Sequence, residues 1–239
     1  MGFDSIKLEL YRNILNSIAE EMGVALCRSA LSTNIKERRD FSCAIFNRHG
    51  QMIAQAAHIP VHLGSMPLSV MSAIKEIEMS KDDMVILNDP FRGGTHLPDI
   101  TLVSPVFIET KIPIFFVANR AHHADVGGMT PGSMPLSNHV VQEGIRIPPI
   151  KIVENGEIRG DVFELLLSNV RTPKERCGDL ESQISTNRIG KQRLIETSEK
   201  YGVTEVSDYM DRLQEYSARL MRQSLRHLPD GSYSFSDFL

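Results

Sequence analysis

Apolar side chains recur every three or four residues in three parts of the chain. Residues 6–31 show this spacing, which predicts one long amphipathic helix (Ile6, Leu10, Ile14, Ile18 and Met22). Residues 65–79 show it again. From about 172 to 227 the pattern predicts one helix through Glu175–Glu199 and a second through Val206–Leu225. Within this last region Asp179 and Gln183 share a helix face, where surface polarity is the simplest interpretation.

Runs of β-branched and aromatic residues between these helices indicate two β-hairpins. In the first hairpin, a turn of arginine, histidine and glycine joins Phe41–Asn47 to Gln51–Ala56. The second hairpin pairs Asp99–Ile108 with Ile112–His122. Two prolines in it each remove a ladder donor, which predicts that this hairpin is bulged or lies at a sheet edge (Pro105 and Pro113).

These elements predict an α+β fold, with a mixed or antiparallel sheet flanked by long helices and incomplete at its C-terminal end. A further strand is predicted at Met84–Leu87, short strands and turns over residues 145–163, and the beginning of a strand at Ser232–Leu239. The expected organisation is one domain portion of four parts: a helix, a strand-rich region with the candidate site, a helical region and the start of a truncated strand (1–35, 36–165, 170–228 and 229–239).

Two histidine–aspartate clusters flank the second hairpin, His96-Leu97-Pro98-Asp99 and His122-His123-Ala124-Asp125. Imidazole and carboxylate are the usual ligands of a divalent cation that activates water or polarises a carbonyl. The hairpin brings the clusters together, which predicts a metal site held by His96, Asp99 and one histidine of the pair, suited to zinc, manganese or iron. In the simpler interpretation, Asp99 caps a turn and the histidines seal a strand end.

The register of the hairpin decides between the two adjacent histidines. With a two-residue loop at 110–111, Asp99 faces His122 on the same side of the sheet. With a three-residue loop Asp99 faces His123 instead, because neighbours on a strand point to opposite faces. The sequence leaves both registers open. Asp125 is expected to be a further ligand, to orient an imidazole, or to serve as a base.

Other polar residues lie in turns and loops. His58 and His62 are predicted to line one pocket, or to be partly buried histidines held by hydrogen bonds. Asn88 and Asp89 are typical either of a loop around a polar substrate or of a turn. Arg39 lies in a run of charged residues that usually forms a solvated face, although an arginine there can hold a carboxylate or phosphate.

The composition narrows the functional classes. The chain has 239 residues, a net charge of −4 and scattered basic residues, which excludes a nucleic-acid surface and a polybasic membrane patch. Three widely spaced cysteines indicate buried thiols in a reducing compartment (Cys27, Cys43 and Cys177). No signal peptide or membrane-length apolar stretch is visible, so we expect a cytoplasmic location. No P-loop, dinucleotide fingerprint or nucleophile elbow occurs, so ATP would have to come from another polypeptide or fold.

Several long and unusual motifs run in order over nearly the whole chain: ERRDFSCA (37–44), HIPVHLGSM (58–66), NDP and GGTHLPD (88–99), AHHADVGG with PGSMP (121–135) and RTPKERCGDLESQ (171–183). In these motifs the chain resembles the hydantoinase B/oxoprolinase family. Members of that family include ATP-dependent N-methylhydantoinases, 5-oxoprolinases and subunits of acetone- and acetophenone-type carboxylases. The B-type subunits of the family are considerably longer, so the resemblance covers their N-terminal part.

The resemblance implies a division of labour. A hydantoinase A-type partner uses ATP to phosphorylate the carbonyl or enolate oxygen of the substrate, and the B-type part completes ring opening or carboxylation at a metal-containing site. The implied metal ligands are His96, Asp99 and one of His122 and His123. Asp89 and Asp125 are the expected catalytic carboxylates, and three further residues are expected to bind substrate (Arg39, His62 and Asn88).

The leading hypothesis is therefore a subunit, or a truncated part of one, of an ATP-dependent hydrolase that opens a hydantoin or 5-oxoproline-like ring. It would work in a hetero-oligomer with the ATP-using partner. Two alternatives remain: a subunit of an acetone- or acetophenone-type carboxylase, and a non-catalytic assembly fragment that docks the partner.

Overall fold

A computed structural model describes residues 4–57, 59–62, 64–132 and 135–238. The described residues form one seven-stranded sheet in which each strand pairs antiparallel with its neighbours. Its spatial order is β2 (Met52–Ala57), β1 (Phe41–Asn47), β5 (Phe115–His122), β4 (Asp99–Val106), β3 (Met84–Leu87), β6 (Ile150–Glu154) and β7 (Glu157–Ile158). The predicted α+β class with an antiparallel sheet is confirmed.

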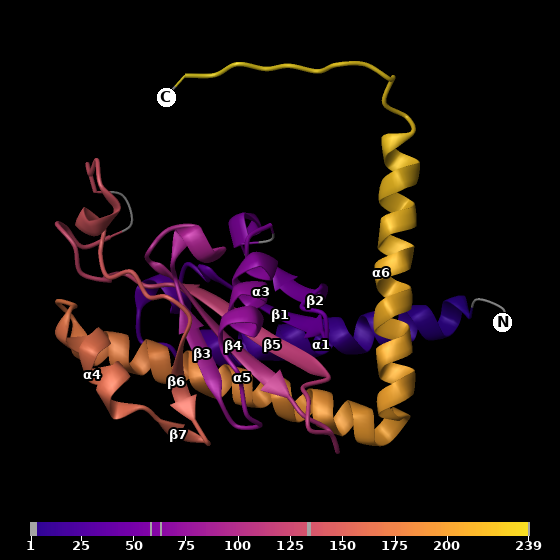
Figure 1. Ribbon diagram of the computed structural model, residues 1–239, viewed down its shortest axis with the longest axis horizontal. Coiled ribbons are helices and arrows are strands. Elements are labelled where there is room, and N and C mark those ends of the chain that lie inside the picture. Colours follow the sequence, from indigo (N-terminus) through magenta and orange to yellow (C-terminus); the bar gives the residue numbers. More distant parts are fainter. Residues whose placement is uncertain (1–3, 58, 63, 133–134, 239) are drawn as a thin grey trace.

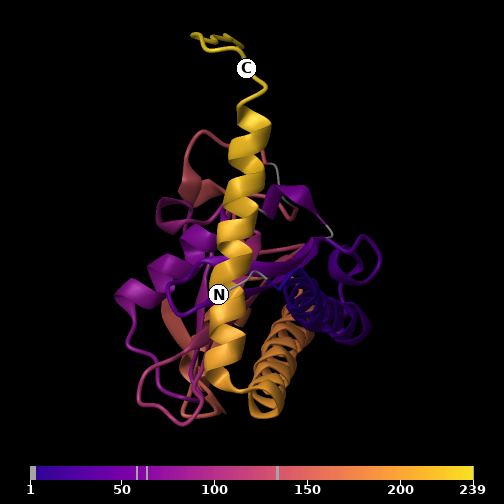
Figure 2. The ribbon, with the colours of Figure 1, turned by 90° about the vertical axis from the view of Figure 1, so that its right-hand side faces the viewer.

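Helices cover the two faces of this sheet unequally (Figures 1 and 2). One face carries the long helices α1 (Ser5–Ser29) and α5 (Pro173–Tyr201). The helix α4 (Gly160–Ser168) and the first half of α6 (Val203–Leu225) lie on the same face. The other face carries the shorter α3 (Met66–Glu76). The second half of α6 rises away from the rest of the fold, as Figure 1 shows.

Strand alternation divides the side chains of β4 and β5 between these two faces. Leu102 and Val117 point toward the long helices, whereas Val103 and Ala118 pack with α3. All eight residues of each strand are buried. The two strands are therefore the middle layer of the molecule, and their ends determine where polar side chains can meet.

The register of the β4–β5 hairpin is the first of the two that the sequence left open. Asp99 pairs with His122 and Val106 pairs with Phe115, without a bulge. The loop is longer than predicted, because β5 begins at Phe115. The expectation of a bulged or edge hairpin is wrong, since both strands lie inside the sheet. Pro105 is tolerated because the pairing of β3 with β4 ends at Val103, so Pro105 lies beyond that ladder.

Two further predictions concern segments outside the hairpins. The short strands and turns predicted over residues 145–163 are confirmed as β6 and β7, but this region ends in an unpredicted helix, α4, whose Val162 and Leu166 are buried one turn apart. Residues 232–238 form no strand, contrary to the prediction, because α6 carries them away from both edges of the sheet. Tyr233 and Phe235 are accordingly exposed. The helices among the described residues are too short or too polar to cross a bilayer.

Candidate metal centre

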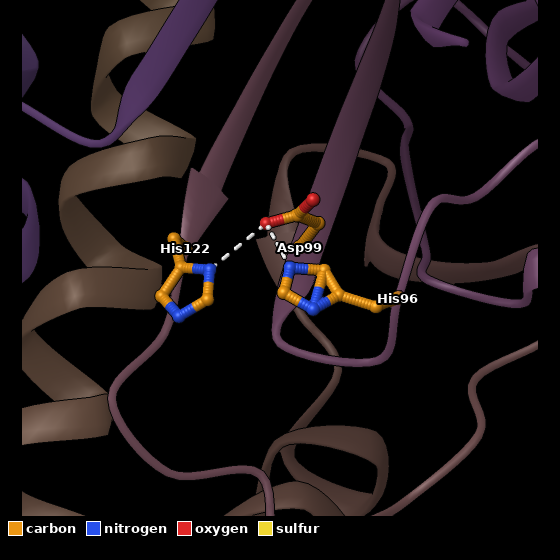
Figure 3. Close-up of side chains that lie close together, drawn as sticks. All are labelled: His96, Asp99 and His122. Atoms are coloured by element: carbon orange, nitrogen blue, oxygen red, sulfur yellow. Dashed lines mark hydrogen bonds and ion pairs between the residues drawn. The ribbon is translucent and has the colours of Figure 1, made fainter. Parts of the chain in front are cut away.

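The candidate site lies where β4 begins and β5 ends, on the α3 face of the sheet. Asp99 is the first residue of β4, His122 is the last residue of β5, and their register places them directly opposite each other. His96 comes from the loop that follows the short 3-10 helix η2 (Pro90–Arg92). Figure 3 shows the side chains of all three residues converging.

One carboxylate oxygen links the three side chains. Asp99 Oδ1 lies 3.1 Å from His96 Nε2 and 3.1 Å from His122 Nδ1. The two imidazole rings are 5.0 Å apart between centroids. Among the described residues, these three form the group whose candidate ligand atoms all lie within 4.8 Å of one another. Asp99 is 2% exposed and the His96 side chain 33%, so the group opens toward solvent on the His96 side.

The chemistry of these donors fits a divalent cation. Ligand atoms that bind a cation at about 2.0–2.2 Å lie roughly 3.0–3.6 Å from one another, which matches the separations around Asp99 Oδ1. Two imidazoles and one carboxylate leave coordination positions open, as in catalytic sites.

The electrostatics of the group favour the protonation states that bind metal. Burial alone would raise the pKa of Asp99, but the neighbouring His122, His62, His96 and Thr95 outweigh it and hold that pKa well below its usual value. Burial lowers the pKa of His96, against the opposing effect of Asp99. At neutral pH the group therefore contains an ionised carboxylate and, at His96, a neutral imidazole with a free lone pair.

The second carboxylate oxygen faces away from the other two members of the group. Thr95 Oγ1 donates a hydrogen bond to Asp99 Oδ2. On the same side, His62 Nε2 lies 3.6 Å from Oδ2, and His62 Nδ1 lies 3.0 Å from Ser42 Oγ. Ser42, His62 and Asp99 are all buried.

Glycines allow the loop that carries Thr95 and His96 to lie close to its neighbours. Gly93 has a φ of +87°, and a Cβ there would come within 2.4 Å of the backbone of α3 at Leu68. A Cβ on Gly94 would come within 2.4 Å of the carbonyl oxygen of Asn88. Any larger residue would push the loop away from α3, so these glycines help to place His96.

Arg120 is a buried residue of this site that we did not predict. It lies two residues before His122 on the same face of β5. Its guanidinium donates hydrogen bonds to Thr101 Oγ1, Ser65 Oγ and Ser69 Oγ. Burial lowers the pKa of Arg120 to about 10, against the opposing effect of Asp99, so it is charged at neutral pH. Its position two residues from His122 is the signal in the sequence that indicates it.

Asp40 is the second residue that we missed. It directly precedes β1, and its backbone oxygen accepts a hydrogen bond from His122 N at 2.9 Å. Its carboxylate Oδ2 lies 3.9 Å from His122 Nδ1. The sequence places Asp40 before a strand, but the pairing of β1 with β5 is needed to bring it beside His122.

His123, the alternative ligand, lies on the opposite face of the sheet. Its Nε2 is 2.8 Å from Gln183 Oε1 of α5, and its side chain is fully buried. Burial, followed by the charge of Arg176, lowers the pKa of His123 to about 4. His123 is therefore a neutral histidine of the helix interface, apart from the group around Asp99.

Asp125 is also away from the group. Its Oδ1 accepts hydrogen bonds from Gly127 N and from Arg171 Nη1 at 2.9 Å, and its Oδ2 accepts one from Arg171 N. These contacts tie the loop after β5 to the segment before α5. A role for Asp125 as base or ligand orienter stays a prediction.

The expected substrate-binding loop is held by its own side chains. Asn88 is buried and donates to the carbonyls of Leu97 and Ile145, while its Oδ1 accepts from Ile147 N. These bonds hold the chain next to His96. Asp89 caps η2 by accepting from Phe91 N at 3.0 Å. The roles of Asn88 and Asp89 in binding and catalysis stay predictions.

The other two predicted residues lie differently. Arg39 is exposed, with a φ of 55°, directly before Asp40. His62 lies beside Asp99, on the side of Oδ2, whereas its predicted companion His58 lies outside the described residues.

Comparison with known proteins places the chain among its relatives. The family model described as hydantoinase B/oxoprolinase matches residues 4–239. An uncharacterized protein of Methanocaldococcus jannaschii is 45% identical over 231 residues, which cover 94% of this chain and 41% of that protein. A putative B-type subunit of a D-/L-hydantoinase, from a Pseudomonas strain, is 36% identical over 245 residues, covering 99% of this chain and 41% of that protein.

Solved structures agree. The ATP-dependent caprolactamase from Pseudomonas jessenii superposes with a TM-score of 0.92 at 33% identity, covering all of this chain and 42% of that one. A nucleotide-free acetone carboxylase shares the fold, with a TM-score of 0.81 at 20% identity over 87% of this chain and 28% of that one. The chain thus spans less than half the length of these relatives. From the match over residues 4–239, the chain belongs to the hydantoinase B/oxoprolinase family.

Proposed function

We propose that this chain provides the metal-binding part of an ATP-dependent hydrolase that opens a cyclic amide such as a hydantoin or a 5-oxoproline-like ring. The observation that carries the proposal is the group His96, Asp99 and His122, whose atoms converge at a partly open position. The names of the caprolactamase and of the hydantoinase relative, both more than 30% identical to this chain, support the choice of cyclic amides.

In this proposal His96, Asp99 and His122 hold a divalent cation such as zinc, manganese or iron, with Asp40 next to them. Such a cation, when bound, supplies Lewis acidity toward the carbonyl of the substrate. Asp99, whose pKa is lowered by its neighbours, contributes an ionised oxygen at Oδ1, and His96, whose pKa is lowered by burial, contributes a neutral nitrogen on the open side. Buried Arg120 holds the strand ends and α3 together behind them.

A partner is part of the proposal. The sequence has no P-loop, and a cyclic amide is a poor electrophile until its oxygen is activated. We therefore assign the use of ATP to a hydantoinase A-type subunit, which would phosphorylate the substrate before it reaches the cation. The hydantoinase relative is itself named as a subunit, which supports a hetero-oligomer.

The test is an assay of the protein together with that partner. We expect ATP consumption that depends on a cyclic amide, and loss of ring opening in the variant His96→Ala with the partner's binding retained. The matched control is His227→Ala, because His227 is an exposed histidine next to the C-terminal end of α6. ATP consumption that depends on bicarbonate and a ketone instead would contradict the hydrolase and indicate the carboxylase. Partner binding without turnover on either substrate would indicate the assembly fragment.

A further inference from the structure

The two oxygens of Asp99 have different neighbours, and this difference assigns a role to His62. Oδ1 faces His96 and His122, which are the other members of the candidate metal group. Oδ2 faces Thr95 and His62. A cation held by the group would therefore take Oδ1, and Oδ2 would remain for hydrogen bonds from the protein.

His62 is buried and incompletely bonded. His62 is 1% exposed, and its Nε2 atom has no hydrogen-bond partner among the described residues although it is inaccessible to solvent. Asp99 Oδ2 lies 3.6 Å from this nitrogen, which is longer than the roughly 2.7–3.2 Å of a formed hydrogen bond. Buried polar nitrogens almost always have a hydrogen-bond partner. The unpaired Nε2 of His62 therefore indicates a hydrogen bond to Asp99 Oδ2 that is not formed at this distance.

The neighbours of both ring nitrogens together define where the proton of His62 lies. Nδ1 is 3.0 Å from Ser42 Oγ, and a hydroxyl can donate to a bare nitrogen or accept from a protonated one. A bare Nε2 lone pair would face the ionised Asp99 and be repelled. The arrangement with the Ser42 hydroxyl donating to Nδ1 and the Nε2–H pointing at Asp99 Oδ2 avoids this repulsion.

His62 does not join the metal group itself. The group whose candidate ligand atoms lie mutually within 4.8 Å consists, among the described residues, of His96, Asp99 and His122. His62 therefore acts on the site through Asp99, by holding the oxygen that the cation does not take. Carboxylates that ligate a metal are commonly oriented by such hydrogen bonds.

We propose that His62 is a positioning residue of the metal centre: with Ser42 at its Nδ1, it donates from Nε2 to Asp99 Oδ2 and so directs Oδ1 toward the cation. This inference rests on the proposed metal site, and it changes the expected role of His62 from substrate binding to support of a ligand. Because His62 belongs to the short helix η1 (Pro60–His62), this contact also ties the segment before α3 to the site.

The test is titration of the purified protein with Zn²⁺ alone and with Mn²⁺ alone, in competition with a chelating dye. We expect His62→Leu to bind 10–100-fold more weakly than the natural protein, as for other residues that orient metal ligands. His62→Gln, whose amide nitrogen can reach the position of Nε2 and donate, should recover most of that affinity. His227→Leu, at the exposed histidine, is the matched control and should bind normally.

Thermal unfolding of the metal-free variants distinguishes positioning from general support of the fold. We expect His62→Gln to unfold at the same temperature as the unsubstituted protein, and its metal affinity to stay within about threefold of that protein's affinity. The inference is overturned if His62→Leu binds both ions normally, or if His62→Gln loses as much affinity as His62→Leu. A natural protein that binds neither ion would instead overturn the metal site itself, and the inference with it.

Discussion

His122 and His123 are neighbours on one chain, yet they lie in two different chemical environments. His122 points to the α3 face, where it meets Asp99 and Asp40 at a site that is partly open through His96. His123 points to the α5 face, where it contacts Gln183. Behind it, buried Asn119, Gln183 and Asn187 bond to one another and to the backbone of β4.

The difference shows that the two faces of one sheet can carry different kinds of polar side chains: candidate metal ligands on the α3 face and hydrogen bonds that stabilise the fold on the α5 face. On the α5 face the hydrogen bonds of Asn119 and Gln183 run between helix and strand, so they fasten α5 to β4 and β5. On the α3 face two imidazoles, His96 and His122, meet one oxygen, Asp99 Oδ1, and the group is partly exposed at His96. A network of buried side chains that hydrogen-bond to one another stabilises a fold. Ligand atoms that converge and leave coordination positions open are instead suited to binding a cation.

The strongest test of this comparison exchanges the two histidines for alanine one at a time. His122→Ala should weaken metal affinity at least ~1000-fold, or about 4 kcal/mol, because it removes one of three ligands. His123→Ala should leave the affinity within about threefold while lowering the free energy of unfolding by ~1–3 kcal/mol, because Gln183 Oε1 loses a buried partner. Dye-competition titration and urea unfolding measure the two quantities. The reverse pattern would assign the ligand to His123.

The second test removes the buried ion pair of the α5 face. Asp179 is buried beside Arg176, whose Nη2 donates to it at 2.7 Å, and Asp179 Oδ1 accepts hydrogen bonds from Leu31 N and Ser32 N. Asp179→Ala leaves buried Arg176 with only the half-exposed Glu175 and removes the acceptor of two backbone N–H groups, so we expect a loss of ~3–5 kcal/mol in the free energy of unfolding. Urea denaturation of the metal-free protein measures it. A loss below ~1 kcal/mol would contradict the supporting role.

The smallest effect is a pH dependence on the same face. Burial would raise the pKa of Asp179, but Ser32, His123 and Arg176 outweigh it and lower the pKa below its usual 3.8. The unfolded chain then takes up this proton first as the pH falls, so the stabilisation is present above pH 3.8 and is lost below it. Urea unfolding between pH 5 and pH 3 should show a shallower loss in Asp179→Asn than in the natural protein. Equal slopes would refute the assignment.

Local patterns predicted much of the fold and of the metal group. Helical spacing identified α1, α3, α5 and α6, and the β4–β5 hairpin with its two clusters predicted Asp99 beside a histidine. The choice of His122 could not be made from sequence, because it depends on register. Asp40 was missed because the pairing of β1 with β5 joins segments far apart in the chain.

Polarity misled the interpretation of α5. Asp179 and Gln183 were interpreted as surface residues, since charged and amide side chains are usually exposed. Both are buried, because the tertiary structure brings partners to them: Gln183 bonds to the backbone of β4 and to Asn119 of β5, and Asp179 accepts hydrogen bonds from the backbone that follows α1. The helix α4 was missed for a different reason, because its two buried apolar residues are a weak signal next to turn residues.

The position of α5 in the chain has a consequence for synthesis of the protein. The candidate ligands lie between His96 and His122, whereas the helix that covers the other side of β4 and β5 begins at Pro173. At the usual ~5–20 residues per second, the ribosome completes the ligand set seconds before the covering helix emerges. During that interval Asn119 and His123 have no helix to bond. The growing chain thus contains every candidate ligand before it can close its own core.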